Sequence, residues 1–265
     1  MKPLLLVRQS LASKYELRFA EKYFPLVESR MECRERLVIG RYSVLPFYDE
    51  LERDLKLVHA RLINTWEEHQ WISSFDYYQA LQAYTPQSWN EEEFRLCQVE
   101  GPFVVKGRRS SKKRQWNTHM FAPTKRDAWK VAQRLKEDGD IFEQGVIFRR
   151  YIPLKTYQVG HNGLPFTNEW RFFFLEETLL SYGYYWSMAD SAPLATLPAE
   201  AIELARELAR IASRFTTFFC LDLAETEAGT WILIELNDGQ MAVPSENDLD
   251  ELYGNLQLAL SAQKY

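Results

Sequence analysis

Two apolar runs near the C-terminal end, residues 218–223 and 231–237, constrain the fold more than any other feature of the chain. Each has the length of a strand, and the segment 225–230 between them contains a glycine, so the sequence predicts a β-hairpin. Side chains alternate between the two faces of a strand. The alternation predicts one face with Trp231, Leu233, Glu235 and Asn237, and an opposite face with Ile232, Ile234 and Leu236.

The same hairpin brings two carboxylates together. A turn centred between Ala228 and Gly229 places Asp222 directly across from Glu235. Carboxylates about 5 Å apart on facing strands repel each other, so a buried pair of this kind needs a cation or a proton. Oxygen ligands suit Mg²⁺, which usually takes one or two carboxylates together with substrate phosphates. The hairpin therefore predicts an oxygen-lined cation site, toward which the amide of Asn237 also points.

Composition limits the class of protein. The chain has 265 residues, of which 46% are hydrophobic, enough for one large domain or two to three small ones. Its formal net charge of −5 disfavours a general nucleic-acid binder. Cys33, Cys97 and Cys220 are odd in number and far apart, which excludes a disulfide framework and disfavours a zinc site. Apolar stretches are too short for a signal peptide or a membrane span, so we expect a soluble cytoplasmic protein.

The first part of the chain, residues 1–98, is expected to form a small α/β cap. Residues 37–39 are apolar and predict a strand, whereas the spacing of apolar residues over 49–55 is typical of a helix. Thr65, followed three residues later by Glu68, predicts the start of another helix.

A turn-rich segment, residues 85–90, leads toward a second region, residues 99–265, where strands alternate with helices. This pattern predicts an α+β fold. The expected strands cover residues 103–106, 146–148, 170–175 and 179–186, and the expected helices 128–135, 198–215 and 246–262.

Lys106 ends an apolar strand, where it presents a point charge suited to phosphate. A lysine that extends from a strand end into solvent is the structural alternative. The basic segment 108–114 follows at once and contains two serines, so it could fold over a polyphosphate or form a solvated face. Together with Trp116 and His119 it could also contact nucleic acid.

Glu169 and Arg171 share one face of an expected strand, opposite to Trp170. One interpretation is a structural cross-strand ion pair. The functional interpretation is that Arg171 offers a planar, bidentate donor to phosphate.

Several common motifs are missing. The chain has no GxxxxGK[ST] loop, no GxGxxG after a strand, no GxSxG elbow and no HExxH helix. These absences argue against the corresponding nucleotide-binding, hydrolase and metalloprotease chemistries. The four histidines are scattered without ligand spacing.

Together these segments resemble the ATP-grasp superfamily, and more narrowly its R2K branch, named for one arginine and two lysines. The resemblance covers about residues 98–245, and its most specific part is the Glu-x-Asn that follows an Asp-bearing strand. It implies an ATP-grasp fold, in which two α+β subdomains grip ATP, and residues 37–90 resemble the cap that precedes it. The segments that carry it are residues 104–106, 111–112, 168–171, Asp222 and 234–239.

The resemblance also implies roles for single residues. Asp222, Glu235 and Asn237 match ligands of Mg²⁺. Lys106 matches one phosphate lysine and Lys112 the other, with Lys113 as the alternative. Arg171 matches the arginine near the γ-phosphate, Glu169 accompanies it in the motif, and Ile152 corresponds to a hinge residue beside adenine. Relatives often place an acidic residue after the hinge to bind ribose, where this chain has Pro153, Leu154 and Lys155.

The implied activity is ligation of a carboxylate to an amine through an acyl phosphate, with ATP converted to ADP. The substrates would be small molecules or peptides. The alternative is an ATP-binding assembly protein without turnover and with a protein partner, because the superfamily includes a translation-factor assembly chaperone. Arg41, Tyr48 and Trp66 of the cap could form an acceptor pocket or a protein-docking face, and the basic segment leaves phosphotransfer or nucleic-acid end modification open.

Overall fold

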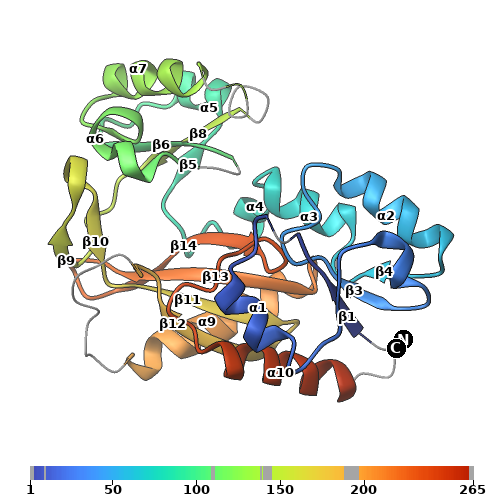
Figure 1. Ribbon diagram of the computed structural model, residues 1–265. Helices are drawn as coiled ribbons and strands as arrows, with labels where there is room; N and C mark the ends of the chain where they lie inside the picture. The colour runs from blue at the N-terminus through green and yellow to red at the C-terminus, as the bar shows by residue number, and fades with distance from the viewer. Residues whose placement is uncertain are drawn as a thin grey trace.

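The computed structural model describes residues 3–8, 10–108, 111–137, 139, 145–187 and 197–262. Within these residues the chain forms an N-terminal α/β region, a central four-stranded sheet, and a smaller four-stranded sheet that stands over one end of the central one (Figure 1). This is the expected α+β architecture. Arg109 and Ser110 of the basic segment lie outside the described residues.

The N-terminal region is a parallel sheet with strand order β2-β1-β3-β4. Its strands are apolar on both faces because both are covered. Leu4, Leu6 and Val38 pack toward α2, whereas Leu5 and Ile39 pack toward the C-terminal helix α10. The bounds are β1 Pro3–Leu6, α1 Lys14–Ala20, β2 Leu26–Val27, β3 Leu37–Ile39, α2 Tyr48–Leu57, β4 Arg61–Leu62, α3 Trp66–Ser73 and α4 Tyr77–Leu81. The expected strand at 37–39, the helix after it and the Thr65–Glu68 capping box are confirmed.

The central sheet is antiparallel, with strand order β12-β11-β13-β14. Alternation along β11 sends Phe172 and Phe174 into the core under helix α9, while Phe173 faces the core shared with α10 and the N-terminal sheet. The sheet is therefore buried on both sides over much of its area. The bounds are β11 Glu169–Leu175, β12 Thr178–Tyr184, α9 Ala199–Ala212, β13 Phe218–Glu225, β14 Trp231–Asp238 and α10 Leu249–Ala262.

The small sheet has order β5-β8-β6-β7 and is also antiparallel. Phe94 of α5 and Phe148 of β8 stack at its core, 4.0 Å apart between ring centroids. β5 and α5 precede residue 98 yet pair and pack here, and the hairpin β9–β10 was not foreseen from the sequence. The bounds are β5 Ser88–Trp89, α5 Glu91–Leu96, β6 Phe103–Gly107, α6 Trp116–His119, β7 Phe121–Ala122, α7 Lys125–Leu135, β8 Val146–Arg150, β9 Thr156–Val159 and β10 Pro165–Thr167.

The hairpin β13–β14 contains a bulge that changes which residues share a face. Asp222 pairs with Glu235 as expected, but Leu223 pairs with Leu233, so Ile234 is an extra residue in β14. The expected grouping of Trp231 and Leu233 with Glu235 is therefore wrong. Leu233 and Leu236 both pack in the core under α9, and Ile232 lines the opposite side together with Glu235.

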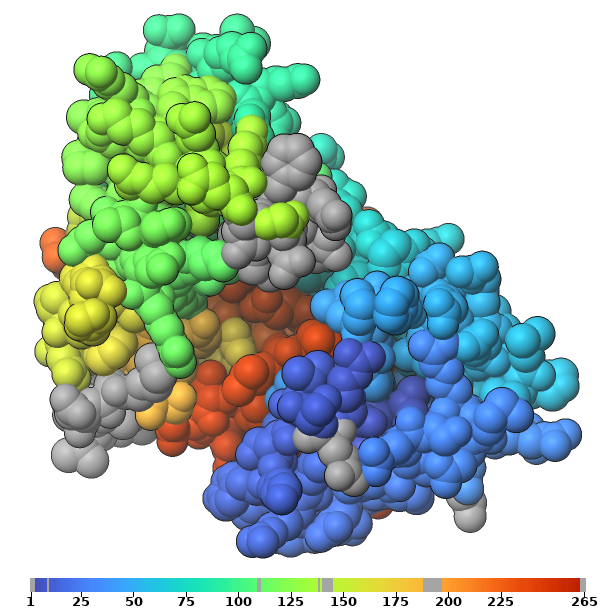
Figure 2. Space-filling model, turned by 45° about the horizontal axis from the view of Figure 1, so that its top comes forward, coloured from blue at the N-terminus to red at the C-terminus, as the bar shows by residue number. Residues whose placement is uncertain are grey.

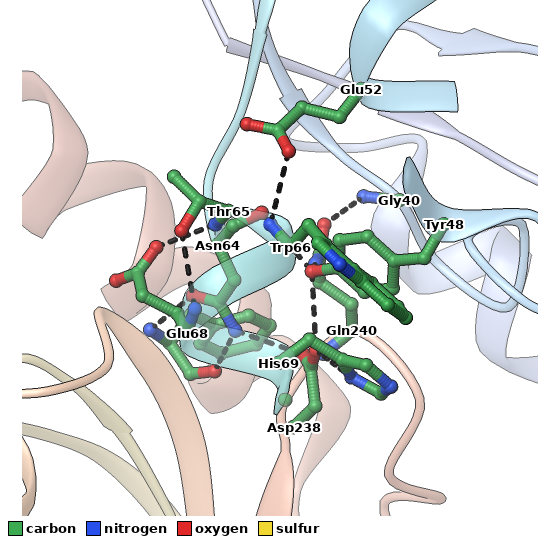
Figure 3. Close-up of polar contacts among 12 residues, drawn as sticks. Gly40, Tyr48, Glu52, Asn64, Thr65, Trp66, Glu68, His69, Asp238 and Gln240 are labelled. Atoms are coloured by element: carbon green, nitrogen blue, oxygen red, sulfur yellow. Dashed lines mark hydrogen bonds and ion pairs between the residues drawn. The ribbon is translucent and has the colours of Figure 1, made fainter. Parts of the chain in front are cut away.

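The N-terminal region docks on the end of β14 through a buried polar network (Figure 3). Asp238 accepts hydrogen bonds from Asn64 Nδ2 at 2.9 Å and from Tyr48 Oη at 3.3 Å, and its Oδ2 lies 3.0 Å from His69 Nδ1. Asn64 also bonds the backbone N–H and C=O of Phe218, at 2.7 and 2.6 Å. These contacts fix the strand ends that carry Asn237 and Asp238.

Two cap residues proposed from the sequence for an acceptor pocket lie in the interior instead. Arg41 is 2% exposed and donates to Glu16 Oε1 and to the carbonyl of Gly239, each at 2.7 Å. Tyr48 is fully buried in the Asp238 network. An acceptor pocket or docking face built on Arg41 and Tyr48 is therefore wrong. Among the described residues, no helix has the length and apolar character needed to cross a membrane.

Candidate functional site

A cleft with about 860 Å³ of empty space, including the part open to solvent, lies between the small sheet and the central sheet. Figure 2 shows the surface hollowed where the small-sheet region, the N-terminal region and the chain after β14 approach one another. Apolar side chains and charged ones both line the cleft, as in sites for ligands that have a ring and a polar tail. The lining includes Val104, Met120, Ile152, Leu164 and Ile232, and the charged residues Lys106, Lys113, Arg149, Glu169 and Glu235.

Lys106 and Glu235 form an ion pair across this cleft. Lys106 belongs to β6 of the small sheet and Glu235 to β14 of the central sheet, and the Lys106 Nζ donates to Glu235 Oε1. Burial by itself raises the pKa of Glu235, but the charges of Lys106 and Lys113 outweigh it and lower this pKa to about 2. Burial lowers the pKa of Lys106, although Glu235 opposes that shift. The pair joins the two sheets electrostatically.

Arg171 and Asp222 form a second pair, within the central sheet. The register places them directly opposite on β11 and β13, and Arg171 Nε and Nη2 donate to the two carboxylate oxygens at 2.8 Å each. Asn237 Nδ2 donates to Asp222 Oδ2 at 3.3 Å, and Arg171 Nη1 donates to the Val243 carbonyl at 2.6 Å. The structure thus brings together the predicted metal ligands, but holds Asp222 in the cross-strand ion pair that was the structural alternative for Arg171.

The two candidates for the second phosphate lysine differ in position. Lys113 lines the cleft, donates to the Tyr185 hydroxyl at 2.5 Å and lies 4.1 Å from the centroid of that ring. Burial acts to lower the pKa of Lys113, but Tyr185, Glu169 and Glu235 together raise it, so the ammonium is charged. Lys112 instead lines a neighbouring pocket beside Arg171. The geometry favours Lys113 for contact with a ligand in the cleft.

Two buried polar atoms in the lining have no hydrogen-bond partner among the described residues: Glu169 Oε1 and Arg149 Nη2. Glu169 is 3% exposed, and burial raises its pKa to about 7, against the opposing charge of Lys113. Arg149 bonds Ser88 and the Ile234 carbonyl through its other nitrogens. Unpaired buried groups are costly, so their presence indicates a site that a polar ligand completes.

The family resemblance places Arg149 at the start of the hinge segment that ends at Ile152, but sequence reasoning did not single out its charge as part of the site, although the signal was available. It follows the apolar residues Val146, Ile147 and Phe148 in β8, as Lys106 follows the apolar residues of β6. A cation at the end of an apolar strand is the same pattern that singled out Lys106. Ile152 follows β8 and lines the cleft.

The charges of the site fit a magnesium nucleotide. Lys106, Lys113, Arg149 and Arg150 line the cleft together with Glu169 and Glu235, so cations exceed carboxylates by two, and by three when Glu169 is protonated. The Arg171–Asp222 pair beside the cleft adds one charge of each sign. Among the described residues, no group of three or more His, Cys, Asp or Glu side chains is arranged to hold a metal unaided. Two carboxylates and an amide suit Mg²⁺ only when phosphate oxygens complete its shell. The residues present therefore fit the ion together with a phosphate ligand.

Comparison with known proteins agrees with this architecture. The crystal structure of the D-cycloserine synthetase DcsG covers 97% of this chain and 99% of its own, with a TM-score of 0.61 at 13% identity. A RimK domain ATP-grasp protein from Sphaerobacter thermophilus gives 97% and 98% coverage, a TM-score of 0.58 and 12% identity. The ATP-grasp ligase PsnB, complexed with a minimal precursor, Mg and ADP, covers 82% and 68% with a TM-score of 0.51 at 10% identity. At these identities the likeness establishes the ATP-grasp fold.

A search of curated protein sequences gives no significant match. Comparison with protein-family models identifies the family, because residues 86–256 match the one described as ATP-grasp domain, R2K clade family 3. The matched segment contains β6, β8, β11, β13 and β14, which carry Lys106, Arg149, Arg171, Asp222 and Glu235. This chain belongs to the ATP-grasp domain family of the R2K clade, family 3.

Proposed function

We propose that this protein is an ATP-dependent ligase that joins a carboxylate to an amine and releases ADP and phosphate. The observation that carries the proposal is two cation–carboxylate contacts, Lys106 with Glu235 at the cleft and Arg171 with Asp222 beside the adjoining pocket. Each contact holds one group suited to phosphate and one suited to a divalent cation. Similarity in fold to the ligase PsnB, which was solved with Mg and ADP, supports this assignment.

The nucleotide would lie with its base near Ile152 and its phosphates near Lys106 and Lys113. Asp222, Glu235 and Asn237 would hold Mg²⁺, which supplies charge neutralisation at the β- and γ-phosphates. Lys106 and Arg171 would exchange their carboxylate partners for phosphate oxygens. Such an exchange keeps every buried charge paired in both states, which a low-dielectric site requires.

The chemistry needs positioning more than a protein nucleophile. A substrate carboxylate oxygen bonds to the γ-phosphorus while the bond from that phosphorus to the bridging oxygen of ADP breaks. The amine nitrogen then bonds to the acyl carbon, the carbon–oxygen bond to phosphate breaks, and the protons lost by the amine pass to phosphate and water. Arg171, beside the expected γ-phosphate position, would stabilise the charge that develops during the first step.

A binding experiment tests the nucleotide site. Saturating Mg·ATP should raise the melting temperature of the wild type by several degrees, since about 100-fold excess over Kd adds about 2.7 kcal/mol. Glu235→Gln removes one proposed metal ligand and should abolish the shift, whereas Glu177→Gln, at an exposed turn between β11 and β12, should retain it. An undiminished shift in Glu235→Gln would refute the metal assignment.

Product analysis tests the reaction class. ADP and phosphate should form in equal amounts, and only when both a carboxylate and an amine are supplied. Loss of Lys106 or Glu235 should reduce the rate at least about 100-fold, equivalent to about 2.7 kcal/mol of barrier. AMP and pyrophosphate would indicate adenylation instead. Tight Mg·ATP binding without turnover, together with one co-purifying protein, would favour the assembly-protein alternative.

A further inference from the structure

Two pockets of opposite charge adjoin each other beside Arg171. The cationic pocket is lined by Lys112, Lys113, Arg114 and Arg171, and its described lining has no carboxylate. The acidic pocket is lined by Glu16, Glu246, Asp248 and Asp250, and its described lining has no lysine or arginine. The residues shared by both pockets are Ser187, Val243 and Ser245.

The cationic pocket also adjoins the nucleotide cleft. Lys113 and Ser111 line both, and Arg171 bonds Asp222 on one side and the Val243 carbonyl on the other. A ligand in this pocket would therefore lie between the expected γ-phosphate and the acidic pocket. A carboxylate is the group that its guanidinium and ammonium side chains would attract.

The acidic pocket carries net negative charge. Glu16 is paired with Arg41 and Asp250 with Lys22, which leaves Glu246 and Asp248 as exposed carboxylates without an ion-pair partner among the described residues. The segment that carries Glu246 and Asp248 packs directly against β12 at Gly183, where a Cβ would lie 2.3 Å from the Asn247 nitrogen.

Apolar side chains also line the acidic pocket, together with the polar residues Ser13, Ser187, Ser245 and Asn247. Leu11, Tyr15 and Val243 are 58%, 65% and 60% exposed, an unusual degree of exposure for large hydrophobic side chains grouped around one cavity. A surface that combines carboxylates with apolar side chains suits a ligand with an ammonium group next to an apolar group. An α-amino acid or a peptide N-terminus with an apolar side chain has this chemistry.

We propose that the acidic pocket binds the amine substrate, an α-amino compound with an apolar side chain, while the cationic pocket binds the carboxylate substrate. This assignment rests on the proposed ligase function and adds the location and class of each substrate. Opposite pocket charges would prevent either substrate from occupying the wrong site. The shared residues, at Ser187, Val243 and Ser245, mark where the two reacting groups meet.

Calorimetry on protein loaded with Mg and a non-hydrolysable ATP analogue tests the assignment with two probes. Phenylalaninamide has the ammonium but no carboxylate, and N-acetylphenylalanine has the carboxylate but no ammonium. The double variant Glu246→Gln/Asp248→Asn should weaken the binding of phenylalaninamide at least about fivefold, because two partly exposed ion pairs are lost. It should leave the binding of N-acetylphenylalanine unchanged. Arg114→Gln should weaken the binding of N-acetylphenylalanine and leave the binding of phenylalaninamide unchanged. Asp248→Asn keeps an acceptor for the Glu251 N–H that Asp248 now bonds.

The control variants are Glu177→Gln and Arg126→Gln, both at exposed positions away from these pockets, and neither should affect the binding of either probe. Equal binding of phenylalaninamide by the double variant and the wild type, or no binding to the wild type at millimolar concentration, would overturn the assignment. Failure of the ATP analogue itself to bind would instead reject the proposed function. The two failures are therefore distinguishable.

Discussion

At the scale of single residues, the site is built from charges that are already paired before any ligand is present. Lys106 and Glu235 are 8% and 20% exposed in their side chains, and Arg171 and Asp222 are 7% and 0% exposed. Buried ions of this kind persist only with partners. Arg149 has only neutral hydrogen-bond partners among the described residues, and Glu169 has a pKa that burial raises to about 7, which favours its protonated form.

Variants of the Lys106–Glu235 pair should affect folding stability and nucleotide binding differently. Lys106→Met leaves a buried carboxylate unpaired and should lower the free energy of unfolding by about 3 kcal/mol, measured by urea denaturation. Lys106→Met/Glu235→Gln should recover at least half of this loss, because it removes the orphan charge. Neither variant should show a melting-temperature shift with Mg·ATP. A double variant as unstable as the single one would contradict the role of the pair.

Glu169 should make stability depend on pH. Its pKa is about 7 in the folded protein, whereas the ordinary value for a glutamate is 4.5, so the folded protein binds the proton more tightly than the unfolded chain. Its favourable contribution is complete below pH 4.5 and is lost as the pH rises through 7. Between pH 5 and pH 8 the wild type should lose about 1–3 kcal/mol relative to Glu169→Gln. Parallel pH profiles for the two proteins in urea denaturation would argue against the raised pKa.

At the scale of elements, the ends of β13 and β14 are positioned by a residue outside their sheet. Asn64 lies between β4 and α3, yet its amide bonds Phe218 at the start of β13 and Asp238 at the end of β14. The side chain acts like a short neighbouring strand, since it satisfies one backbone donor and one acceptor. The strand that carries Glu235 and Asn237 is thereby tied to the N-terminal region.

Removal of the Asn64 side chain should lower the stability of the fold. Asn64→Ala leaves the Phe218 N–H without its buried acceptor and removes one of the hydrogen bonds to Asp238, so it should lower the free energy of unfolding by about 3 kcal/mol. Gln133→Ala, at an exposed position of α7, should change it by less than about 0.5 kcal/mol. Chemical denaturation of both variants provides the comparison. A loss of less than about 1 kcal/mol for Asn64→Ala would show that the docking contact is dispensable.

At the scale of the whole molecule, residues 86–256, here called the family domain, share one core with the N-terminal region. Leu5, Phe24 and Ile39 from the N-terminal region pack in the same cluster as Phe173 and Tyr253 from the family domain. Residues 86–256 match the family, but the apolar surfaces of α10 and the central sheet are completed by residues before 86.

A fragment of residues 86–265 should therefore not fold cooperatively. Deletion of the N-terminal region exposes the shared core to water, and burial of apolar surface is the main source of stability. We expect no cooperative thermal transition by calorimetry and strong binding of a hydrophobic dye. A sharp transition that Mg·ATP shifts upward would demonstrate that the family domain is autonomous.

Sequence alone determined the strands and helices whose periodicity is strong, and the relative placement of several candidate site residues. The hairpin with Asp222 opposite Glu235, the Thr65 capping box, and the shared face of Glu169 and Arg171 all follow from local rules of alternation and capping. Family resemblance added the ATP-grasp fold, which the comparisons confirm.

Tertiary structure decided what alternation cannot express. One bulge residue, Ile234, moved Leu233 to the core while keeping Glu235 at the cleft, and no local pattern predicts such an insertion. Long-range contacts buried Arg41 and Tyr48, placed Lys113 rather than Lys112 on the cleft, and added Arg149 to the site. The reason is that periodicity specifies a face of each element, whereas the neighbours on that face depend on how distant elements pack.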